Sequence, residues 1–156
     1  MKRMQWRQTF GILALLCGCG GDPPDKLIST GFDANEMEEA ITRARGRIDV
    51  FVAQMEKGDG TDFSVKVKIT DGKENEHFWL SDLSFRDGVF EGSISNEPGI
   101  VRNVKRWQRW NVAKSDISDW MYRKNGKIRG NYTLRPLLKA MPPAEAAKYR
   151  ELLAEP

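Results

Sequence analysis

Few side chains in this sequence could carry out chemistry on their own. His77 is the only histidine, and Cys17 and Cys19 are the only cysteines. One chain therefore cannot form a His-based metal triad. Both thiols lie in the segment Leu16-Cys17-Gly18-Cys19, which is interpreted below as a lipidation signal, so no catalytic Cys–His pair is expected. The acidic residues after Asp59 lack the closing Glu of an EF-hand calcium loop. His77 shares one face of a predicted strand with Trp79, so we expect a hydrogen-bonded structural role for it, no metal site and no cofactor.

Asp119 and Arg135 are the polar residues best suited to act on a substrate. A carboxylate can move a proton and a guanidinium can hold an anion, so the pair fits an enzyme acting on an anionic or sugar-like substrate. A structural role explains both equally well, with Asp119 capping a turn and Arg135 satisfying a buried acceptor or carboxylate. A deep pocket with convergent polar groups would favour the enzyme, and a shallow surface with the two residues paired internally would favour a binding module.

Arg106 and Trp107 lie in the most basic stretch of the chain. Residues 19–97 hold 9 Lys and Arg against 17 Asp and Glu, whereas residues 98–156 hold 13 against 5. The basic residues that alternate with Trp107 and Trp110 in this stretch are Arg102, Lys105, Arg106, Arg109 and Lys114. Together they could hold an anionic or sugar-like ligand through stacking and cation–π contact. The alternative is that the acidic and basic halves neutralise each other within one fold.

The first residues have the pattern of a secretory signal. Residues 1–9 hold three basic residues and no acid, and the apolar run over residues 10–16 is too short to span a bilayer. The run ends in Leu16-Cys17-Gly18-Cys19, which resembles the lipobox of bacterial lipoproteins. This resemblance implies cleavage before Cys19, a lipid on that cysteine and, because Gly20 follows it, sorting to the outer membrane on the periplasmic side. The alternatives are a plain signal peptide with incidental cysteines, or a cytoplasmic chain with an apolar start.

Without residues 1–18, the chain is electrically balanced. The 22 Lys and Arg that remain equal the 22 Asp and Glu, so nucleic acid is not expected as a partner. Residues 19–31 lack apolar periodicity and are predicted to form a tether. Residues 32–156 are long enough for a single domain. One remaining cysteine cannot form an internal disulfide, so the core alone must stabilise this domain.

The apolar periodicity of residues 32–156 predicts an α+β fold. Asp33 with Glu36 resembles a capping box, and an apolar stripe follows over a helix of about six turns, which Gly46 weakens but need not end. Strands are predicted over residues 63–70, 76–80, 89–95, 107–112, 119–124 and 127–133, and a short helix begins at Pro142. We therefore expect an N-terminal amphipathic helix packed on an antiparallel meander sheet of about five to six strands, with a short C-terminal helix.

Asn125-Gly126 predicts the tightest hairpin of the domain. A type I′ turn needs positive φ at both central residues, and this dipeptide tolerates it best. The register then sets Tyr122 opposite Arg129 and Met121 opposite Gly130. We expect this hairpin to be the structural signature of the domain, with Trp120, Tyr122 and Arg129 as a candidate binding face.

Several blocks carry a family resemblance. They are His77-Phe78-Trp79-Leu80, Gly92 with Asn96 and Pro98, and residues 117–121 followed by Gly126, Gly130 and Tyr132-Thr133-Leu134-Arg135. In these blocks the chain resembles the YegJ-like domain-of-unknown-function family over residues 32–141. Members are small bacterial proteins, some with a similar lipoprotein start, and the family has no established activity. The chain departs from the family pattern at Trp107-Gln108, where a Gly-Gln pair is expected.

Taken together, these features predict a lipid-anchored binding or accessory module of the cell envelope. Its lipid would be carried by Cys19, and its ligand would be an envelope protein or an anionic envelope component. The alternative is an envelope enzyme that uses Asp119 and Arg135.

Overall fold

The structure, a computed structural model, describes residues 10–12, 26–28 and 31–155. Cys19, the rest of the predicted signal and most of the predicted tether lie outside these ranges. Two short strands, β1 (Phe10–Ile12) and β2 (Lys26–Ile28), pair antiparallel in a small separate sheet. Among the helices that the structure describes, none is both long enough and apolar enough to cross a membrane.

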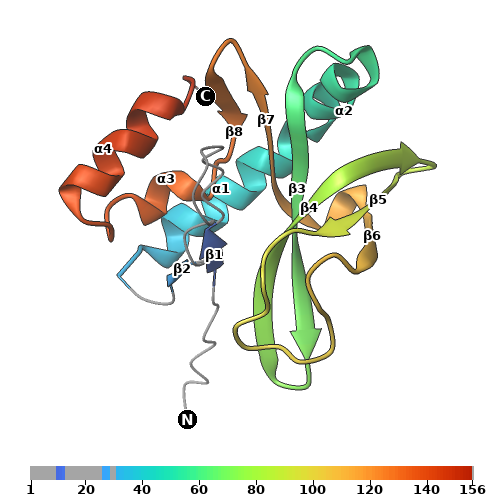
Figure 1. The fold of residues 1–156 in the computed structure, drawn as a ribbon. Helices are drawn as coiled ribbons and strands as arrows, with labels where there is room; N and C mark the ends of the chain where they lie inside the picture. Colours follow the sequence, from blue (N-terminus) through green and yellow to red (C-terminus); the bar gives the residue numbers. More distant parts are fainter. Residues whose placement is uncertain (1–9, 13–25, 29–30, 156) are drawn as a thin grey trace.

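A six-stranded antiparallel sheet forms the centre of the domain (Figure 1). Its strands are β3 (Thr61–Asp71), β4 (Glu74–Arg86), β5 (Val89–Ile94), β6 (Arg109–Ala113), β7 (Ile117–Lys124) and β8 (Lys127–Gly130). Their order is β6-β5-β4-β3-β7-β8. The predicted meander is therefore right for β3 to β6. After β6 the chain returns to the free side of β3, where β7 and β8 complete the sheet, so β6 and β8 are the two edges.

Two helices stand where a single one was predicted. Asp33 caps α1 (Ala34–Gly46) by accepting hydrogen bonds from the amides of Asn35 and Glu36 at 2.8 and 3.0 Å. The helix stops at Gly46, and α2 (Ile48–Lys57) begins after Arg47, whose φ of −115° is not helical. The predicted single helix of about six turns is therefore wrong, because helical geometry is interrupted directly after Gly46. The buried residues of α2 all join one core cluster, whereas α1 contributes Ala40 and Ala44 to that cluster and Met37 and Ile41 to a second one.

The Asn125-Gly126 hairpin is confirmed. These two residues have φ values of 52° and 73°, as a type I′ turn requires. Tyr122 pairs with Arg129 and Met121 with Gly130, as predicted. Gly130 has a φ of 78°, and a Cβ there would lie 2.3 Å from the Trp120 carbonyl oxygen. This position therefore needs glycine, both for its backbone conformation and for the close approach of Trp120.

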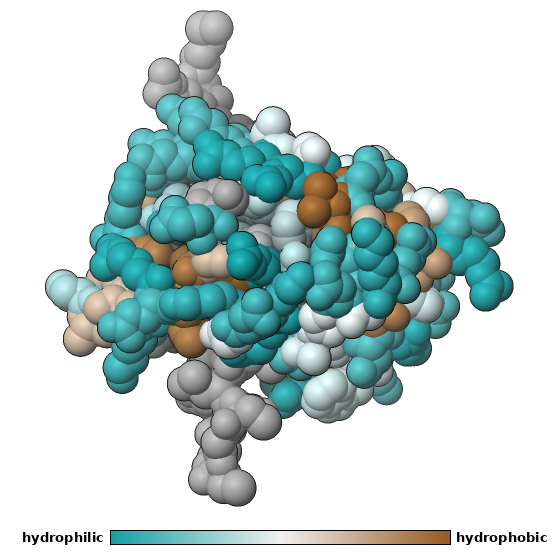
Figure 2. Space-filling model, turned by 90° about the horizontal axis from the view of Figure 1, so that it is seen from above, coloured by the Kyte–Doolittle hydropathy of each residue, from teal (hydrophilic) through white to brown (hydrophobic). Residues whose placement is uncertain are grey.

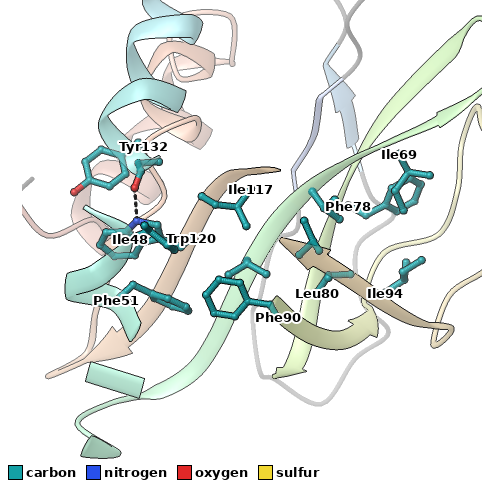
Figure 3. Packing of buried hydrophobic residues seen from close by; sticks show 14 of the residues in the cluster. Ile48, Phe51, Ile69, Phe78, Leu80, Phe90, Ile94, Ile117, Trp120 and Tyr132 are labelled. Carbon is teal, nitrogen blue, oxygen red and sulfur yellow. Dashed lines mark hydrogen bonds between the residues drawn. The ribbon is translucent and has the colours of Figure 1, made fainter. Parts of the chain in front are cut away.

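The larger core cluster lies between the sheet and the α1–α2 pair (Figure 3). Phe51 of α2 packs on Trp120 with ring centroids 5.4 Å apart, and Tyr132 meets the edge of the same indole. The indole nitrogen of Trp120 donates a 2.8 Å hydrogen bond to the carbonyl of Ala44, at the end of α1. Trp120 thus ties β7 to the helix pair by packing and by a buried hydrogen bond.

A second core cluster packs beside β7 and β8. Two helices that follow the hairpin contribute to it: α3 (Leu134–Leu137), which was not predicted, and α4 (Pro143–Leu152), which was. Met37 and Ile41 of α1 and Trp79 of β4 belong to the same cluster. The sheet is therefore covered on part of both faces, and this explains why some polar residues of β3 and β4 are buried.

Candidate binding surface

Asp119, the predicted acid of an enzyme site, is fully buried inside a hydrogen-bond network. Its Oδ1 accepts from the amides of Trp120 at 2.8 Å and Tyr132 at 3.1 Å. Its Oδ2 accepts from the amide of Thr133 at 2.8 Å and from the Thr133 hydroxyl at 2.6 Å. Asp119 therefore fixes the turn that leads from β8 to α3. This geometry matches the predicted turn-capping role and leaves no carboxylate oxygen facing solvent.

Lys66 completes this network from the neighbouring strand. Its Nζ donates to the Thr133 hydroxyl at 2.8 Å and lies 4.7 Å from the centre of the Trp79 ring. Burial lowers the pKa of Lys66 to about 8, although the charge of Asp119 opposes that shift. Burial likewise raises the pKa of Asp119, against the influence of Lys66 and the Thr133 hydrogen bonds. The burial of Lys66 was not predicted, since Lys66 alternates with Val65 and Val67 as a solvent-facing residue would.

His77 and Glu76 are also buried structural residues. The Nδ1 of His77 lies 2.9 Å from the Ser118 hydroxyl, which donates to the Lys66 carbonyl, so the imidazole is the donor in this pair. Glu76 accepts hydrogen bonds of 2.9 to 3.2 Å from the backbone amides of residues 99–101. Glu76 thereby holds the long loop between β5 and β6, a role that sequence reasoning missed. Within the described ranges, no three His, Cys, Asp or Glu side chains gather as a metal site.

Arg135 is hydrogen-bonded to the C-terminal segment. Its Nη2 donates a 2.8 Å hydrogen bond to the carbonyl of Ala154, and the side chain is partly buried. Asp119 is thus satisfied internally, whereas Arg135 is bonded through Nη2 and its buried Nε has no hydrogen-bond partner among the described residues. The two side chains do not pair with each other. The structure does not bring them together in a pocket.

The predicted binding face of the hairpin is divided between core and surface. Trp120 and Tyr122 are buried, and Tyr122 stacks on Phe63 with ring centroids 5.1 Å apart. Only Arg129, on β8, is exposed. The expectation of an aromatic binding face is therefore corrected: α2 covers these rings, because the same apolar periodicity that marks a binding platform also marks a core strand.

Trp107 is instead the exposed aromatic residue. It is 61% exposed, more than Val50 or Val89, the other large apolar residues exposed in the described part of the chain. Its φ is 68°, a left-handed conformation that is rare for a bulky side chain. The Trp107 amide donates to the Ile94 carbonyl at 2.8 Å, and the amide of Gln108 donates to Lys105 at 3.2 Å. Glycine would adopt this backbone without strain, as the Gly-Gln pair expected from the family resemblance would.

Arg106 lies against the exposed indole. Its guanidinium carbon is 4.6 Å from the centre of the Trp107 ring, within the range of a cation–π contact. The predicted pairing of basic and aromatic groups is therefore present at Arg106 and Trp107. Trp110, by contrast, is partly buried against the core. The turn therefore places a guanidinium against an exposed indole.

An open depression lies beside this turn, along β6. Its volume is about 440 Å³, and it is lined by Glu91, Gln108, Arg109, Trp110 and Asn111. Arg109 is already engaged, since it forms a 2.9 Å ion pair with Glu91 and also donates to Ser93 and to the Asp82 carbonyl. The depression therefore offers amide side chains and part of an indole more than a free charge. We call Arg106, Trp107 and the lining residues of this depression the Trp107 surface.

The acidic and basic halves of the chain do neutralise each other in the fold. Five ion pairs among the described residues each join an acid from before residue 98 to a base after it; their bases are Arg109, Lys114, Arg123, Lys124 and Lys139. The face shown in Figure 2 is mostly hydrophilic, with hydrophobic residues in small separate patches. Charge alone therefore does not mark a binding site.

Comparison with known proteins places this domain in a family. Residues 34–154 match the family described as "Uncharacterized protein conserved in bacteria (DUF2314)". The chain is 47% identical over 129 residues to "Uncharacterized protein YegJ" of Escherichia coli K12, covering 83% of this chain and 84% of that protein. It is 36% identical over 80 residues to "Putative ankyrin repeat protein NMB1133/NMB1171" of Neisseria meningitidis serogroup B, covering 51% of this chain and 31% of that protein. No solved structure matches the chain. The predicted resemblance is confirmed, and the chain belongs to the DUF2314 family of bacterial proteins.

Proposed function

We propose that this protein is a lipid-anchored binding or accessory module of the bacterial envelope, which recognises an envelope partner through the Trp107 surface. The observation that carries the proposal is that Trp107 is exposed and has a left-handed backbone conformation. A left-handed backbone costs a residue other than glycine about 1–2 kcal/mol, and an exposed indole regains little of that by burial. Tryptophan at this position is understandable if a partner covers the ring, because Trp and Arg are the residue types that dominate binding energies.

The positions of Asp119 and Arg135 favour a binding role over an enzyme. All the hydrogen bonds to the Asp119 carboxylate come from within the domain, and the side chain is fully buried. Arg135 is bonded to the C-terminal segment. The depression beside β6 is shallow and open, whereas active sites usually enclose their substrate.

The membrane anchor in this proposal rests on the N-terminal sequence. A basic start, a short apolar run and Leu16-Cys17-Gly18-Cys19 together support lipidation of Cys19. Cys19→Ser should release the protein from the membrane fraction without changing its folding, because the tether would separate the lipid from the domain. Normal membrane retention of this variant would refute the anchor, and would leave the binding role of the domain open to its own test.

The binding role is tested by capture from the bacterial envelope. The mature protein, purified from membranes in detergent, is photo-crosslinked in envelope extract as wild type, Trp107→Ala and Val50→Ala. Val50 is the matched control, since it is exposed on α2 and also loses an apolar side chain. We expect the same specific component in the wild type and Val50→Ala, with a loss of tenfold or more, about 1.4 kcal/mol, for Trp107→Ala.

Two results would contradict the proposal. Equal capture by Trp107→Ala would refute the Trp107 surface as the contact. If the wild type captures no specific component at all, a binding module is the wrong class of function, and a search for turnover of envelope material would follow.

A further inference from the structure

Of the two edge strands of the central sheet, β8 is covered by another segment of the chain and β6 is not, among the described residues. β8 is covered by the protein's own C-terminal segment: Leu153 forms a parallel bridge with Ile128, and the Ala154 amide donates to the Ile128 carbonyl at 2.9 Å. No equivalent segment among the described residues pairs with β6, at the opposite edge.

The backbone of β6 presents alternate groups outward. The Ile94 amide donates to the Gln108 carbonyl, and the Lys114 amide donates to the Gly88 carbonyl. Even-numbered residues from 108 to 114 therefore turn their backbone groups toward β5, because an antiparallel ladder repeats every second residue. The amides and carbonyls of Arg109 and Asn111 and the amide of Ala113 point away from β5. The Ala113 carbonyl instead caps the short 3-10 helix over Lys114–Asp116.

This edge also lacks the usual protection against strand pairing. Proteins guard exposed edges with proline, lysine or a bulge in the edge strand. β6 reads Arg-Trp-Asn-Val-Ala, pairs regularly with β5 over its whole length, and its one charged side chain is turned into an ion pair with Glu91. The depression of the Trp107 surface follows the same edge, and Trp107 stands just beyond its N-terminal end.

We infer that β6 takes up an extended segment of a partner polypeptide by strand addition, with an apolar side chain of that segment covering Trp107. The inference rests on the proposed function and specifies how the partner is held. Main-chain hydrogen bonds to Arg109, Asn111 and Ala113 would provide the affinity, and the depression beside them would select side chains.

A second copy of this chain fits the edge less well. A symmetric antiparallel pairing centred on Asn111 would set Trp107 opposite Ser115 of the other copy. Ser115 and Asp116 are exposed polar residues, so the indole would remain uncovered. A different polypeptide can supply an apolar side chain at that point.

The test uses a proline that the fold can accept. Ala113 already has a φ of −65°, the value that a proline ring imposes, and its amide faces outward. Ala113→Pro should therefore keep the domain folded while removing one donor and blocking a neighbouring strand. Ala113→Ser keeps the amide and is the matched control. Asn111→Pro, at the centre of the edge, is the second variant if the first does not fold.

The probe is a random heptapeptide library displayed on phage and panned against the mature protein. We expect selected peptides to bind the wild type and Ala113→Ser equally, and to bind Ala113→Pro at least about tenfold more weakly. Amide hydrogen exchange of Arg109, Asn111 and Ala113 should slow when the peptide is bound.

Three results would overturn strand addition: no peptide is selected, a selected peptide binds without protecting β6, or the protein alone is a dimer with β6 already protected. The proposed function is judged separately. If Ala113→Pro captures the envelope component as well as the wild type does, while Trp107→Ala does not, strand addition fails and the binding module stands.

Discussion

His77 should make the domain less stable as the pH falls below neutrality. Burial, followed by the charges of Lys66, Lys68 and Arg45, lowers the pKa of His77 from 6.5 to about 3. In the unfolded chain the imidazole takes up a proton as the pH falls through 6.5, whereas in the folded domain it stays neutral until about pH 3. The stability linked to His77 is therefore fully present above pH 6.5 and is lost as the pH falls toward 3.

The size of the effect follows from the difference between the two pKa values. Each pH unit between them changes the free energy of unfolding by about 1.4 kcal/mol. Between pH 7 and pH 5, His77 should therefore remove about 2 kcal/mol, a large part of the 5–15 kcal/mol typical of a domain. Because His77 is the only histidine, no other imidazole adds to this change.

Urea unfolding at pH 7 and pH 5 measures this difference. His77→Asn is the comparison, because its amide can still donate to Ser118 but does not titrate. The variant should lose about 2 kcal/mol less than the wild type over this range. If the two proteins lose the same free energy, His77 is not buried as a neutral ring and the packing described around β4 is wrong.

Three further substitutions test the roles assigned to individual residues through urea unfolding. Asp119→Asn should lower the free energy of unfolding by about 3–5 kcal/mol. The Asn side chain has an NH2 group where one carboxylate oxygen accepts hydrogen bonds, and Lys66 would be buried without a charge partner. A loss below about 1 kcal/mol would contradict the network. Gly130→Ala should cost about 3 kcal/mol, since its Cβ would overlap the Trp120 carbonyl, and a neutral result would refute that contact. Trp107→Gly should unfold no more easily than the wild type, because relief of about 1–2 kcal/mol of backbone strain offsets the lost cation–π contact. A loss above 1 kcal/mol would show that the indole is structural.

The sequence was sufficient to predict the parts of the fold that depend on local signals. Asn125-Gly126 set the hairpin and its register, and Asp33 marked the start of α1. The return of the chain from β6 to β3 could not be predicted, because strand order depends on contacts between distant residues. The break at Arg47 was missed because a single glycine costs a helix only about 1 kcal/mol, and tertiary packing decides whether the helix continues.

The candidate site was predicted only in part. Arg106 and Trp107 were identified as binding residues because basic and aromatic side chains alternate there, and they do form a cation–π contact. Trp120 and Tyr122 were predicted to bind a ligand because they are aromatic residues of a strand, but both are buried. Alternation along a strand does not tell which face α2 will cover. Lys66 is the opposite case: a lysine among β-branched residues predicts a solvent-facing position, and only the second core cluster explains its burial.

Hydrogen exchange of the mature protein, alone and with the component captured from the envelope, tests most directly whether a partner binds the Trp107 surface. Binding there should slow exchange over residues 105–113, with the largest change at the amides of Arg109, Asn111 and Ala113. Unchanged exchange over residues 105–113, with protection appearing around Arg129 or elsewhere, would contradict it.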